Sequence, residues 1–538
     1  MPRKRARYGV VLVVAMLGLV IALRMLFGPF DAPVRVRIPL NPAGWFGLGL
    51  TILLATKDGR TDNGETPQQG PSGRWSVAVI AAALIGFTTA AFWRTLRLYF
   101  LSDDFILVKI ANTSHFAIRP LFATPGGDGF FRPIGNISLI LTSMCAGVNP
   151  MAWHSMALTL HIVNVLLVFT LATWLCASRL AASFAAALFA IHGTRPETAV
   201  WIAGRFDLVA TLFVLAGLLL FIRSYDEAAS SGYLYAIASL VCMVLAILSK
   251  ESAYIFPLLL VVFLIAKRDL SRRRLGVLIP FFVTAVALLA YRWWLFGGIG
   301  GYRDPHTGQS QVLTLGFSTL KALALRLWTA LYFPINWSKE PGAWLAALML
   351  LYMGALVWLA ANRRYCVEVV FPLGFVLISA LPPLHLLVIG SELGNSRLLY
   401  LPSVGFCIMV AVAADGLRGR VRWIIPCVIL AFHFAALQHN LDSWEYASAK
   451  ATATSIAARN CIVPGVGEIA VSGIPSILQG VPFFANGLFE AIELQRSGAP
   501  FTMMVRAALD DRPTSQSLVW NRMTETADCV RQGNHPGY

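Results

Sequence analysis

The stretch from residue 151 to residue 175, MAWHSMALTLHIVNVLLVFTLATWL, decides the fold class because it contains no Asp, Glu, Lys or Arg. A helix needs about 20 predominantly apolar residues to cross a bilayer, and this stretch supplies them without interruption. Outward from it, comparable apolar runs predict about thirteen transmembrane helices. Their centres lie near Gly18, Gly49, Leu84, Val165, Ala187, Phe213, Met243, Leu260, Val286, Tyr352, Val376, Met409 and Ile429. The sequence therefore predicts an all-α polytopic membrane protein.

The composition of the whole chain agrees with a membrane protein. Of its 538 residues, 57% are hydrophobic and 13% are charged, and the mean hydropathy is +0.67. Soluble domains carry about 25% charged residues and cannot hide so much apolar surface. The formal net charge of +16 comes mainly from short Lys and Arg runs between apolar segments, without a basic stripe interleaved with exposed aromatics. We therefore expect membrane lipids, and no nucleic acid, as partners.

Basic clusters orient the predicted helices, since cytoplasmic loops of membrane proteins carry an excess of Lys and Arg. The clusters are Arg3 to Arg7, Lys267 to Arg274, Arg363 with Arg364, and Arg418 to Arg422. If these clusters lie on the cytoplasmic side, the N-terminus is cytoplasmic and the tail after about Gln438 is external. The first apolar segment has no small-x-small cleavage site before Phe30, so we expect an uncleaved anchor.

These features divide the chain into three parts. Residues 1–74 form a two-helix prelude with a cytoplasmic loop, residues 75–438 form the transmembrane body, and residues 439–538 form a small external region. Two further external segments, Leu101–Pro150 and Gly297–Pro341, are too long to be simple turns. Each contains an apolar stretch that predicts an interfacial helix, Ile134–Cys145 in the first and Phe317–Leu331 in the second.

The chain has eight cysteines, and most lie inside apolar segments. No pair has the close spacing of a zinc site or of a CxxC redox motif. Cys461 and Cys529 both lie in the predicted external region, so they could form a disulfide or remain two unpaired thiols.

An acidic pair opens the first long external segment. Asp103 and Asp104 follow an apolar span that ends at about Phe100. Adjacent carboxylates suit a reaction in which one deprotonates an acceptor hydroxyl while the other tunes it or holds a cation. Asp-Asp pairs in loops also serve as solvated turn or cap residues, so both interpretations stay open.

Arginines occur at the external ends of other helices. Arg132, Arg205 and Arg397 suit a phosphate because guanidinium groups form paired, charge-assisted hydrogen bonds. Each could also be a structural ion-pair partner or bind lipid head groups. Ionisable groups gathered at one face indicate a functional cavity there, whereas transporters usually need charge near mid-membrane as well.

Histidines and a Lys-Glu pair lie near the same predicted face. His154 and His161 are seven residues apart, hence on one helical face, and His192 ends the next span. A zinc site is one alternative, but no HExxH-like spacing accompanies them, so we favour capping or orienting hydrogen bonds. Lys250 and Glu251 could form a buried ion pair that braces two helices.

Four motifs follow one another in the chain: FRPIGNISLILTSMCAGVNPMAWHSMALTLHIVNVLL at 131–167, IHGTRPETAVWIAGRFDLVATLF at 191–213, LSKESAYIFPLLL at 248–260 and SRLLYLPSVGFC at 396–407. In this order they resemble the transmembrane and tetratricopeptide-repeat O-mannosyltransferase-like proteins, members of the GT-C superfamily of membrane glycosyltransferases. The resemblance covers about Leu101 to Cys407. It implies a GT-C-like bundle with an external active site and a polyprenyl-phosphate sugar as donor.

The resemblance also implies roles for individual residues. Asp103 or Asp104 would be the base that activates the acceptor hydroxyl. The donor phosphate would be held by Arg132, Arg205 and Arg397, with Lys250 and His192 nearby. The site would be shaped by Glu197, Asp207, Glu251, His154 and His161.

Three features depart from the family pattern. The family commonly has His-Pro where this chain has His192-Gly193, and Glu-Arg where this chain has Asn395-Ser396-Arg397. No tetratricopeptide-like repeat of about 34 residues occurs in the tail. The identities of the sugar and of the acceptor, a protein, lipid or glycan, therefore stay open.

Together these features predict a glycosyltransferase that moves a sugar from a polyprenyl phosphate to an external hydroxyl in one inverting displacement, with Asp as base. No cofactor is certain, and a divalent cation beside the acidic pair stays open. The alternatives are a polymerase of lipid-linked oligosaccharides, a flippase or other transporter, and an inactive scaffold. We expect a bacterial inner membrane, with an endoplasmic reticulum membrane as the alternative.

Overall fold

The computed structural model of the chain describes residues 71–531 except for internal stretches, the longest of which are 302–329 and 337–365. The predicted helices near Gly18, Gly49 and Tyr352 lie outside the described residues, as does most of the predicted interfacial helix Phe317–Leu331. Nearly all of the predicted prelude, residues 1–74, lies outside them too.

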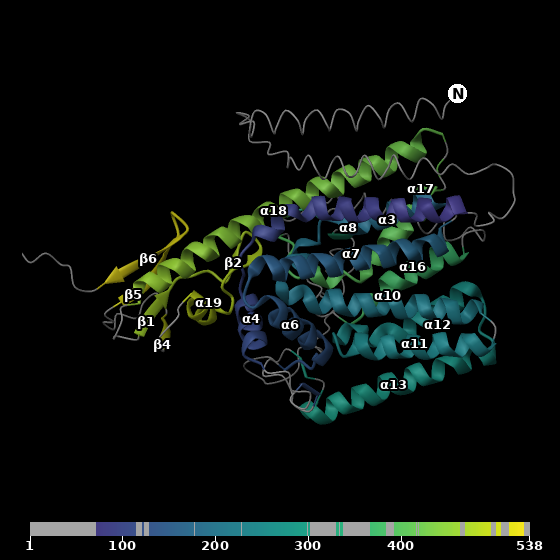
Figure 1. The fold of residues 1–538 in the computed structure, drawn as a ribbon, viewed down its shortest axis with the longest axis horizontal. Helices are drawn as coiled ribbons and strands as arrows, with labels where there is room; N and C mark the ends of the chain where they lie inside the picture. Colours follow the sequence, from purple (N-terminus) through teal and green to yellow (C-terminus); the bar gives the residue numbers. More distant parts are fainter. Residues whose placement is uncertain are drawn as a thin grey trace, which may run out of the picture.

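The described body is a bundle of roughly aligned helices (Figure 1). Its members are α3 Pro71–Phe92, α7 Pro150–Leu175, α8 Arg179–Ile191, α10 Arg205–Asp226, α11 Ala229–Ile247, α12 Phe256–Lys267, α13 Arg272–Phe296, α16 Cys366–Ser379, α17 Pro402–Asp415 and α18 Val421–Cys461. Every predicted helix centre within the described residues falls in one of them. Five helices there are long and apolar enough to cross a membrane. The chain is therefore a multi-pass membrane protein, and the count of about thirteen spans stays a prediction.

Local sequence explains where the central helices begin. The Asn149 side chain accepts a hydrogen bond from the Met151 N–H, and Pro150 occupies the first helical position of α7. The Ser178 hydroxyl accepts a hydrogen bond from the Ala181 N–H at the start of α8. Both residue types satisfy backbone donors that a helix leaves unpaired at its N-terminus.

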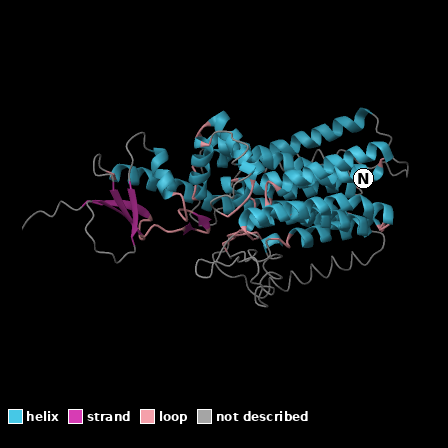
Figure 2. Ribbon diagram, turned by 90° about the horizontal axis from the view of Figure 1, so that it is seen from below, coloured by secondary structure: helices cyan, strands magenta, loops and turns pink. Residues whose placement is uncertain are grey.

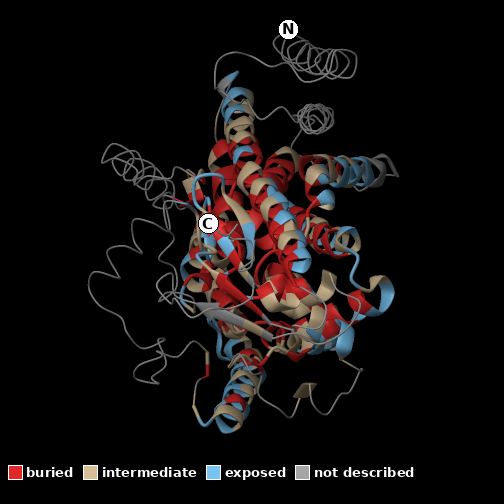
Figure 3. Cartoon of the chain, turned by 90° about the vertical axis from the view of Figure 1, so that its left-hand side faces the viewer, coloured by how far each residue is buried: buried red, intermediate tan, exposed pale blue. Residues whose placement is uncertain are grey.

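The bundle has a buried interior (Figure 3), and many large apolar side chains are exposed on its outside. Helix α8 is buried at every position from Ala181 to Ile191, so neighbouring helices shelter this short segment. Helix α13 is the opposite case, because Ile279, Val283 and Val286 are 61%, 61% and 63% exposed. Large apolar side chains turned outward on a spanning helix are expected to face lipid.

Short helices gather at one end of the bundle, where α4 and α6 lie beside the C-terminal region (Figure 1). They are η1 Trp93–Arg97, α4 Asp103–Thr113, α6 Pro133–Ala146, α9 Pro196–Ala199, η2 Ile202–Gly204, η3 Glu251–Ile255 and η6 Ser396–Leu399. The helix expected over Ile134–Cys145 is confirmed as α6. Its position along the membrane surface stays a prediction.

The C-terminal region corrects the expectation of an all-α chain, because it contains a β-sheet beyond the end of the helical bundle (Figure 2). The elements are β1 Glu468–Ser472, β2 Ile477–Leu478, β3 Val481–Pro482, α19 Leu488–Gln495, β4 Thr502–Arg506, β5 Gln516–Asn521 and β6 Thr526–Arg531. The larger sheet has the order β4-β1-β5-β6, with β1 parallel to both neighbours and β5 antiparallel to β6, while β2 pairs with β3. In β5, Leu518 and Trp520 are buried while Val519 is exposed, which is the two-residue period of a half-buried strand. These strands are too short for their hydrophobic pattern to be recognised in a sequence dominated by membrane helices.

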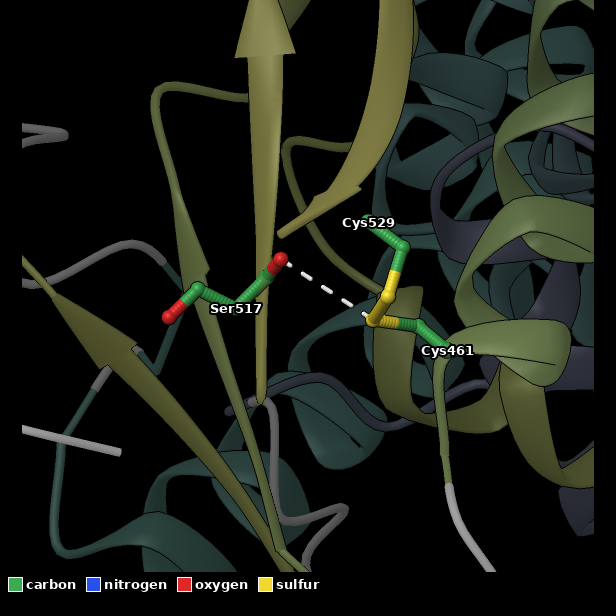
Figure 4. The surroundings of a disulfide bond; sticks show 3 residues. All are labelled: Cys461, Ser517 and Cys529. Carbon is green, nitrogen blue, oxygen red and sulfur yellow. Dashed lines mark hydrogen bonds between the residues drawn. A yellow bond between two sulfur atoms is a disulfide. The ribbon is translucent and has the colours of Figure 1, made fainter. Parts of the chain in front are cut away.

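Helix α18 joins the two regions. It runs along one side of the bundle and continues into the C-terminal region (Figure 1), passing through the predicted domain boundary at residue 438 without a break. At its end Cys461 forms a disulfide with Cys529 of β6, with 5.4 Å between the Cα atoms. The Ser517 carbonyl oxygen of β5 lies 3.9 Å from the Cys461 sulfur (Figure 4). The disulfide therefore ties the sheet to the helix that leads into it.

Candidate functional site

Three ion pairs gather charged residues from the four motifs. The Lys250 Nζ lies 2.6 Å from Asp207 Oδ2, and the Arg132 Nε donates to Glu251 Oε2 at 2.9 Å. An Arg397 guanidinium nitrogen lies 3.4 Å from Glu197 Oε1. Arg132 and Arg397 both act electrostatically on Lys250, so the pairs form one cluster. We call the six residues the charged cluster: Arg132, Glu197, Asp207, Lys250, Glu251 and Arg397.

The pairing in the charged cluster differs from the alternative in which Lys250 binds Glu251. Lys250 pairs with Asp207 at the start of α10, and Glu251 pairs with Arg132 at the start of α6. Burial lowers the pKa of Lys250, and the Asp207 carboxylate offsets part of that shift. Burial would raise the pKa of Glu251, but Arg132, Lys250 and a backbone hydrogen bond together outweigh it and bring that pKa to about 2. Buried Lys250 and partly exposed Glu251 thus each have a partner from another segment.

Close backbone packing holds these segments together. The Ile134 N–H donates to the Leu248 carbonyl at 3.1 Å, which links α6 to the turn that carries Lys250. A Cβ atom added to Gly135 would lie 2.3 Å from the Phe206 ring, next to Asp207. Glycine at 135 therefore lets α6 approach α10 closely, with the Arg132 guanidinium 5.1 Å from the centroid of the Phe206 ring.

Glu197 organises the turn that carries Arg397. Its carboxylate accepts hydrogen bonds from the Asn395 and Arg397 N–H groups at 3.2 and 3.0 Å, and from the Ser396 hydroxyl at 3.0 Å. The Arg397 guanidinium lies over the Trp201 ring, 4.5 Å from its centroid, and its side chain is 18% exposed. Its salt bridge to Glu197 is the longest of the three pairs. Arg397 is therefore the cation of the cluster best placed to take another anion.

The structure gives the two residues of the acidic pair different environments. Asp104 is 1% exposed, and its oxygens accept hydrogen bonds from the Leu101 and Ala203 N–H groups, both at 3.2 Å. Burial raises the pKa of Asp104 well above its ordinary value. Asp103 is partly exposed, and its Oδ1 accepts one hydrogen bond, from the Asn486 side chain at 2.8 Å. Asp104 is thus a buried brace, while Asp103 is partly exposed.

The acidic pair and the charged cluster share a structural link. Ala203, which binds Asp104, lies in η2, and η2 leads directly into α10 with Asp207 in its first turn. The Trp201 indole donates to the Leu101 carbonyl at 3.2 Å while its ring lies under Arg397. The segment 201–207 therefore joins the acidic pair to two of the cations.

Two other residues from the sequence interpretation, Arg205 and His192, are completely buried. Arg205 is completely buried and donates to the Thr142 hydroxyl at 3.0 Å and to the Trp153 carbonyl at 3.1 Å. His192 is completely buried between Thr194 and the Leu331 carbonyl, each 2.9 Å from a ring nitrogen. These positions fit structural roles better than the phosphate contact that the resemblance implies.

The other two histidines of the predicted site, His154 and His161, are also interior. The His161 ring nitrogens lie 2.7 Å from the Tyr400 hydroxyl and 3.0 Å from the Ala190 carbonyl, so the ring orients helices. His154 is 2% exposed and packs near Phe100. Within the described part of the chain, no three His, Cys, Asp or Glu side chains form a group that could hold a metal ion.

Two features of the site were missed or unexplained by the sequence interpretation. Asn486 lies 383 positions from Asp103 in a region without a motif, so nothing local could have indicated their contact. Gly193, where the family commonly has proline, packs so closely that an added Cβ would lie 2.4 Å from the Pro334 carbonyl oxygen. The departure from His-Pro thus accompanies a close backbone approach that only glycine permits.

Comparison with known proteins agrees with the resemblance seen in the motifs. No protein-family model matches the chain. Protein O-mannosyl-transferase TMTC1 of Mus musculus is 29% identical over 192 residues, which cover 32% of this chain and 20% of that protein. Human TMTC3 is 22% identical over 444 residues and human TMTC4 is 24% identical over 404, covering 67% and 63% of this chain. The chain spans 46% and 53% of those two human relatives.

Among solved structures, ArnT from Cupriavidus metallidurans bound to undecaprenyl phosphate aligns with 84% of this chain and 94% of that chain. The TM-score is 0.43 and the sequence identity 11%. A likeness of this size supports no statement about function. The chain is thus similar in sequence to proteins named O-mannosyl-transferases TMTC1, TMTC3 and TMTC4, in agreement with the resemblance that the motifs carry.

Proposed function

We propose that this protein transfers a sugar from a polyprenyl-phosphate donor to a hydroxyl acceptor at the external face of its membrane. The different environments of Asp103 and Asp104 carry this proposal. One carboxylate is accessible, while its neighbour is buried and bound by two backbone N–H groups. The similarity to proteins named O-mannosyl-transferases supports the same reaction class.

In the proposed reaction, Asp103 removes the proton of the acceptor hydroxyl while the hydroxyl oxygen attacks the anomeric carbon of the donor. The bond from that carbon to the phosphate oxygen breaks, and the lipid phosphate leaves with the electron pair. Attack from the opposite side inverts the configuration at the anomeric carbon. Because a lipid phosphate is already a good leaving group, the protein's tasks are positioning, proton removal and charge stabilisation.

Arg397 is the proposed main contact of the donor phosphate. It is partly exposed, and its salt bridge to Glu197 is 3.4 Å long, compared with 2.6 Å for Lys250 and Asp207. Arg132 lies over the Phe130 ring at 4.1 Å and is the second candidate, while buried Lys250 supports both through its charge. Arginine can form paired hydrogen bonds to phosphate oxygens, which stabilises the departing group.

The proposed orientation has a cytoplasmic N-terminus and an external C-terminal region in a bacterial inner membrane. Figure 1 draws the connection between α12 and α13 at the end of the bundle away from α4, and Lys267 and Arg272 flank that connection. Basic connections belong inside. A disulfide between Cys461 and Cys529 fits an oxidising external compartment.

The test is sugar transfer in membranes that contain wild type, Asp103→Asn or Asp104→Asn protein at equal levels. The membranes receive labelled polyprenyl-phosphate sugars and a mixed acceptor extract. We expect transfer by the wild type and its loss in Asp103→Asn. Wild-type activity retained in Asp103→Asn would remove this base from the mechanism. Absence of transfer with every donor would favour transport or a scaffold, and transfer only to a lipid-linked oligosaccharide would favour a polymerase.

A further inference from the structure

A segment of the C-terminal region, Phe483–Gly487, contacts the turn that begins α4. The Ser102 N–H donates to the Phe483 carbonyl at 2.9 Å, and the Asn486 N–H donates to the Ser102 hydroxyl at 3.3 Å. Gly487 has φ of +80°, and an added Cβ would lie 2.3 Å from the Ser102 carbonyl oxygen. Both the backbone angle and the space therefore require glycine at this contact.

Side chains extend this contact along α4 as far as Lys109. The Phe484 and Phe105 rings stack with centroids 5.8 Å apart and an interplanar angle of 12°. Lys109 forms an ion pair with Glu493 of α19, and the two helices lie beside each other (Figure 1). An apolar stack, an ion pair and main-chain hydrogen bonds together make a specific docked arrangement. The segment 483–487 thus has a defined position relative to the acidic pair.

At the centre of this arrangement the Asn486 amide donates to Asp103 Oδ1 at 2.8 Å. A hydrogen bond to one carboxylate oxygen sets the plane of the group and leaves its second oxygen for a substrate. Asn486 carries no charge and cannot compete for the acceptor's proton.

We infer that Asn486 is a positioning residue for sugar transfer, supplied to the acidic pair of the membrane body by the C-terminal region. The inference rests on the proposed function, because it assigns Asn486 the task of orienting the base Asp103. It also gives the C-terminal region a role in the chemical step. Displacement of a reacting group by about 1 Å can lower a rate by about 100-fold.

The test compares full-length wild type, Asn486→Ala and Asn486→Asp in nanodiscs with a labelled polyprenyl-phosphate sugar that the wild type uses. We expect Asn486→Ala to lower kcat about 10- to 100-fold with an unchanged donor KM. Asn486→Asp keeps the shape but turns a carboxylate toward Asp103, so its kcat should fall further. Carbodiimide labelling of Asp103, followed by mass spectrometry, should be faster in Asn486→Ala.

The matched control is Asn521→Ala in the same region. The Asn521 side chain accepts hydrogen bonds from the Met523 and Thr524 N–H groups at 2.9 and 3.3 Å, within the β5–β6 turn. Its loss should loosen the sheet without changing kcat. A control that lowers kcat as much as Asn486→Ala would overturn the inference, because general loosening would then explain both.

The outcomes separate the inference from the function it rests on. Active wild type with equal kcat in both Asn486 variants overturns the positioning role and leaves the proposed transfer standing. Wild type that transfers no sugar from any donor overturns the proposed function and the positioning role together. Active wild type with a selective loss of kcat and faster labelling of Asp103 supports both.

Discussion

The Nζ atom of Lys250 lies 2.6 Å from Oδ2 of Asp207, although the two residues are 43 positions apart in the chain. Their side chains are 7% and 9% exposed, so the pair is almost entirely removed from water. Lys250 follows α11 and Asp207 lies in the first turn of α10, and these helices pack against each other. This ion pair therefore locks one end of a helix pair and places a positive charge beside Arg132 and Arg397.

Breaking that ion pair should destabilise the protein. Lys250→Met or Asp207→Asn leaves one buried charge without its partner, which costs about 3–5 kcal/mol. The double variant Lys250→Met with Asp207→Leu removes both charges and should recover most of the stability. Thermal unfolding in detergent measures all three. Single variants as stable as the wild type would show that water reaches the pair.

The two aspartates should respond differently to the same substitution. In Asp103→Asn, transfer should fall about 100- to 10,000-fold, the usual contribution of a general base, while the unfolding midpoint stays unchanged. In Asp104→Asn an amide N–H group would face a backbone N–H donor, which costs about 1–3 kcal/mol. Its midpoint and its yield of folded protein should fall. Measuring activity and unfolding on the same preparations separates the two effects, and the reverse pattern would exchange the roles.

Acid should weaken the contact between Arg132 and Glu251. The pKa of Glu251 is about 2 in the folded protein, below its ordinary value of 4.5, because Arg132, Lys250 and a backbone hydrogen bond together outweigh the effect of burial. Ionised Glu251 therefore contributes stability above about pH 4.5, and this contribution is lost as the pH falls toward 2. Unfolding midpoints from pH 7 to pH 2 should decline less steeply in Glu251→Gln, which starts less stable at pH 7. Parallel curves for wild type and Glu251→Gln would exclude Glu251 as the source of the stability lost at low pH.

The disulfide should stabilise the C-terminal region. It joins residues separated by 68 positions, and a crosslink over a loop of this size contributes about 2–4 kcal/mol. Cys529→Ser should therefore make the sheet more sensitive to limited proteolysis while α10 stays protected. Cys427→Ser, which changes a free thiol, is the control. Equal cleavage in all three proteins would mean that packing alone holds the region.

The sequence by itself predicted the membrane class and the helix centres within the described part of the chain. Hydrophobic runs such as 151–175 are local signals, and a span of about 20 apolar residues has few alternatives in a bilayer. The order of the motifs also indicated which family the chain resembles. The sequence did not predict the sheet, because strands as short as Glu468–Ser472 carry little periodic signal.

Only the tertiary structure decided how the predicted site residues pair and which of them are accessible. Asp103 and Asp104 are neighbours in sequence, yet one is partly exposed and the other is buried against Leu101 and Ala203. The first turn of a helix points adjacent side chains about 100° apart, so what lies on each side determines their roles. That environment comes from residues 99 and 383 positions away. Apolar patterning follows from the local sequence, whereas burial, pairing and accessibility depend on which distant segments meet.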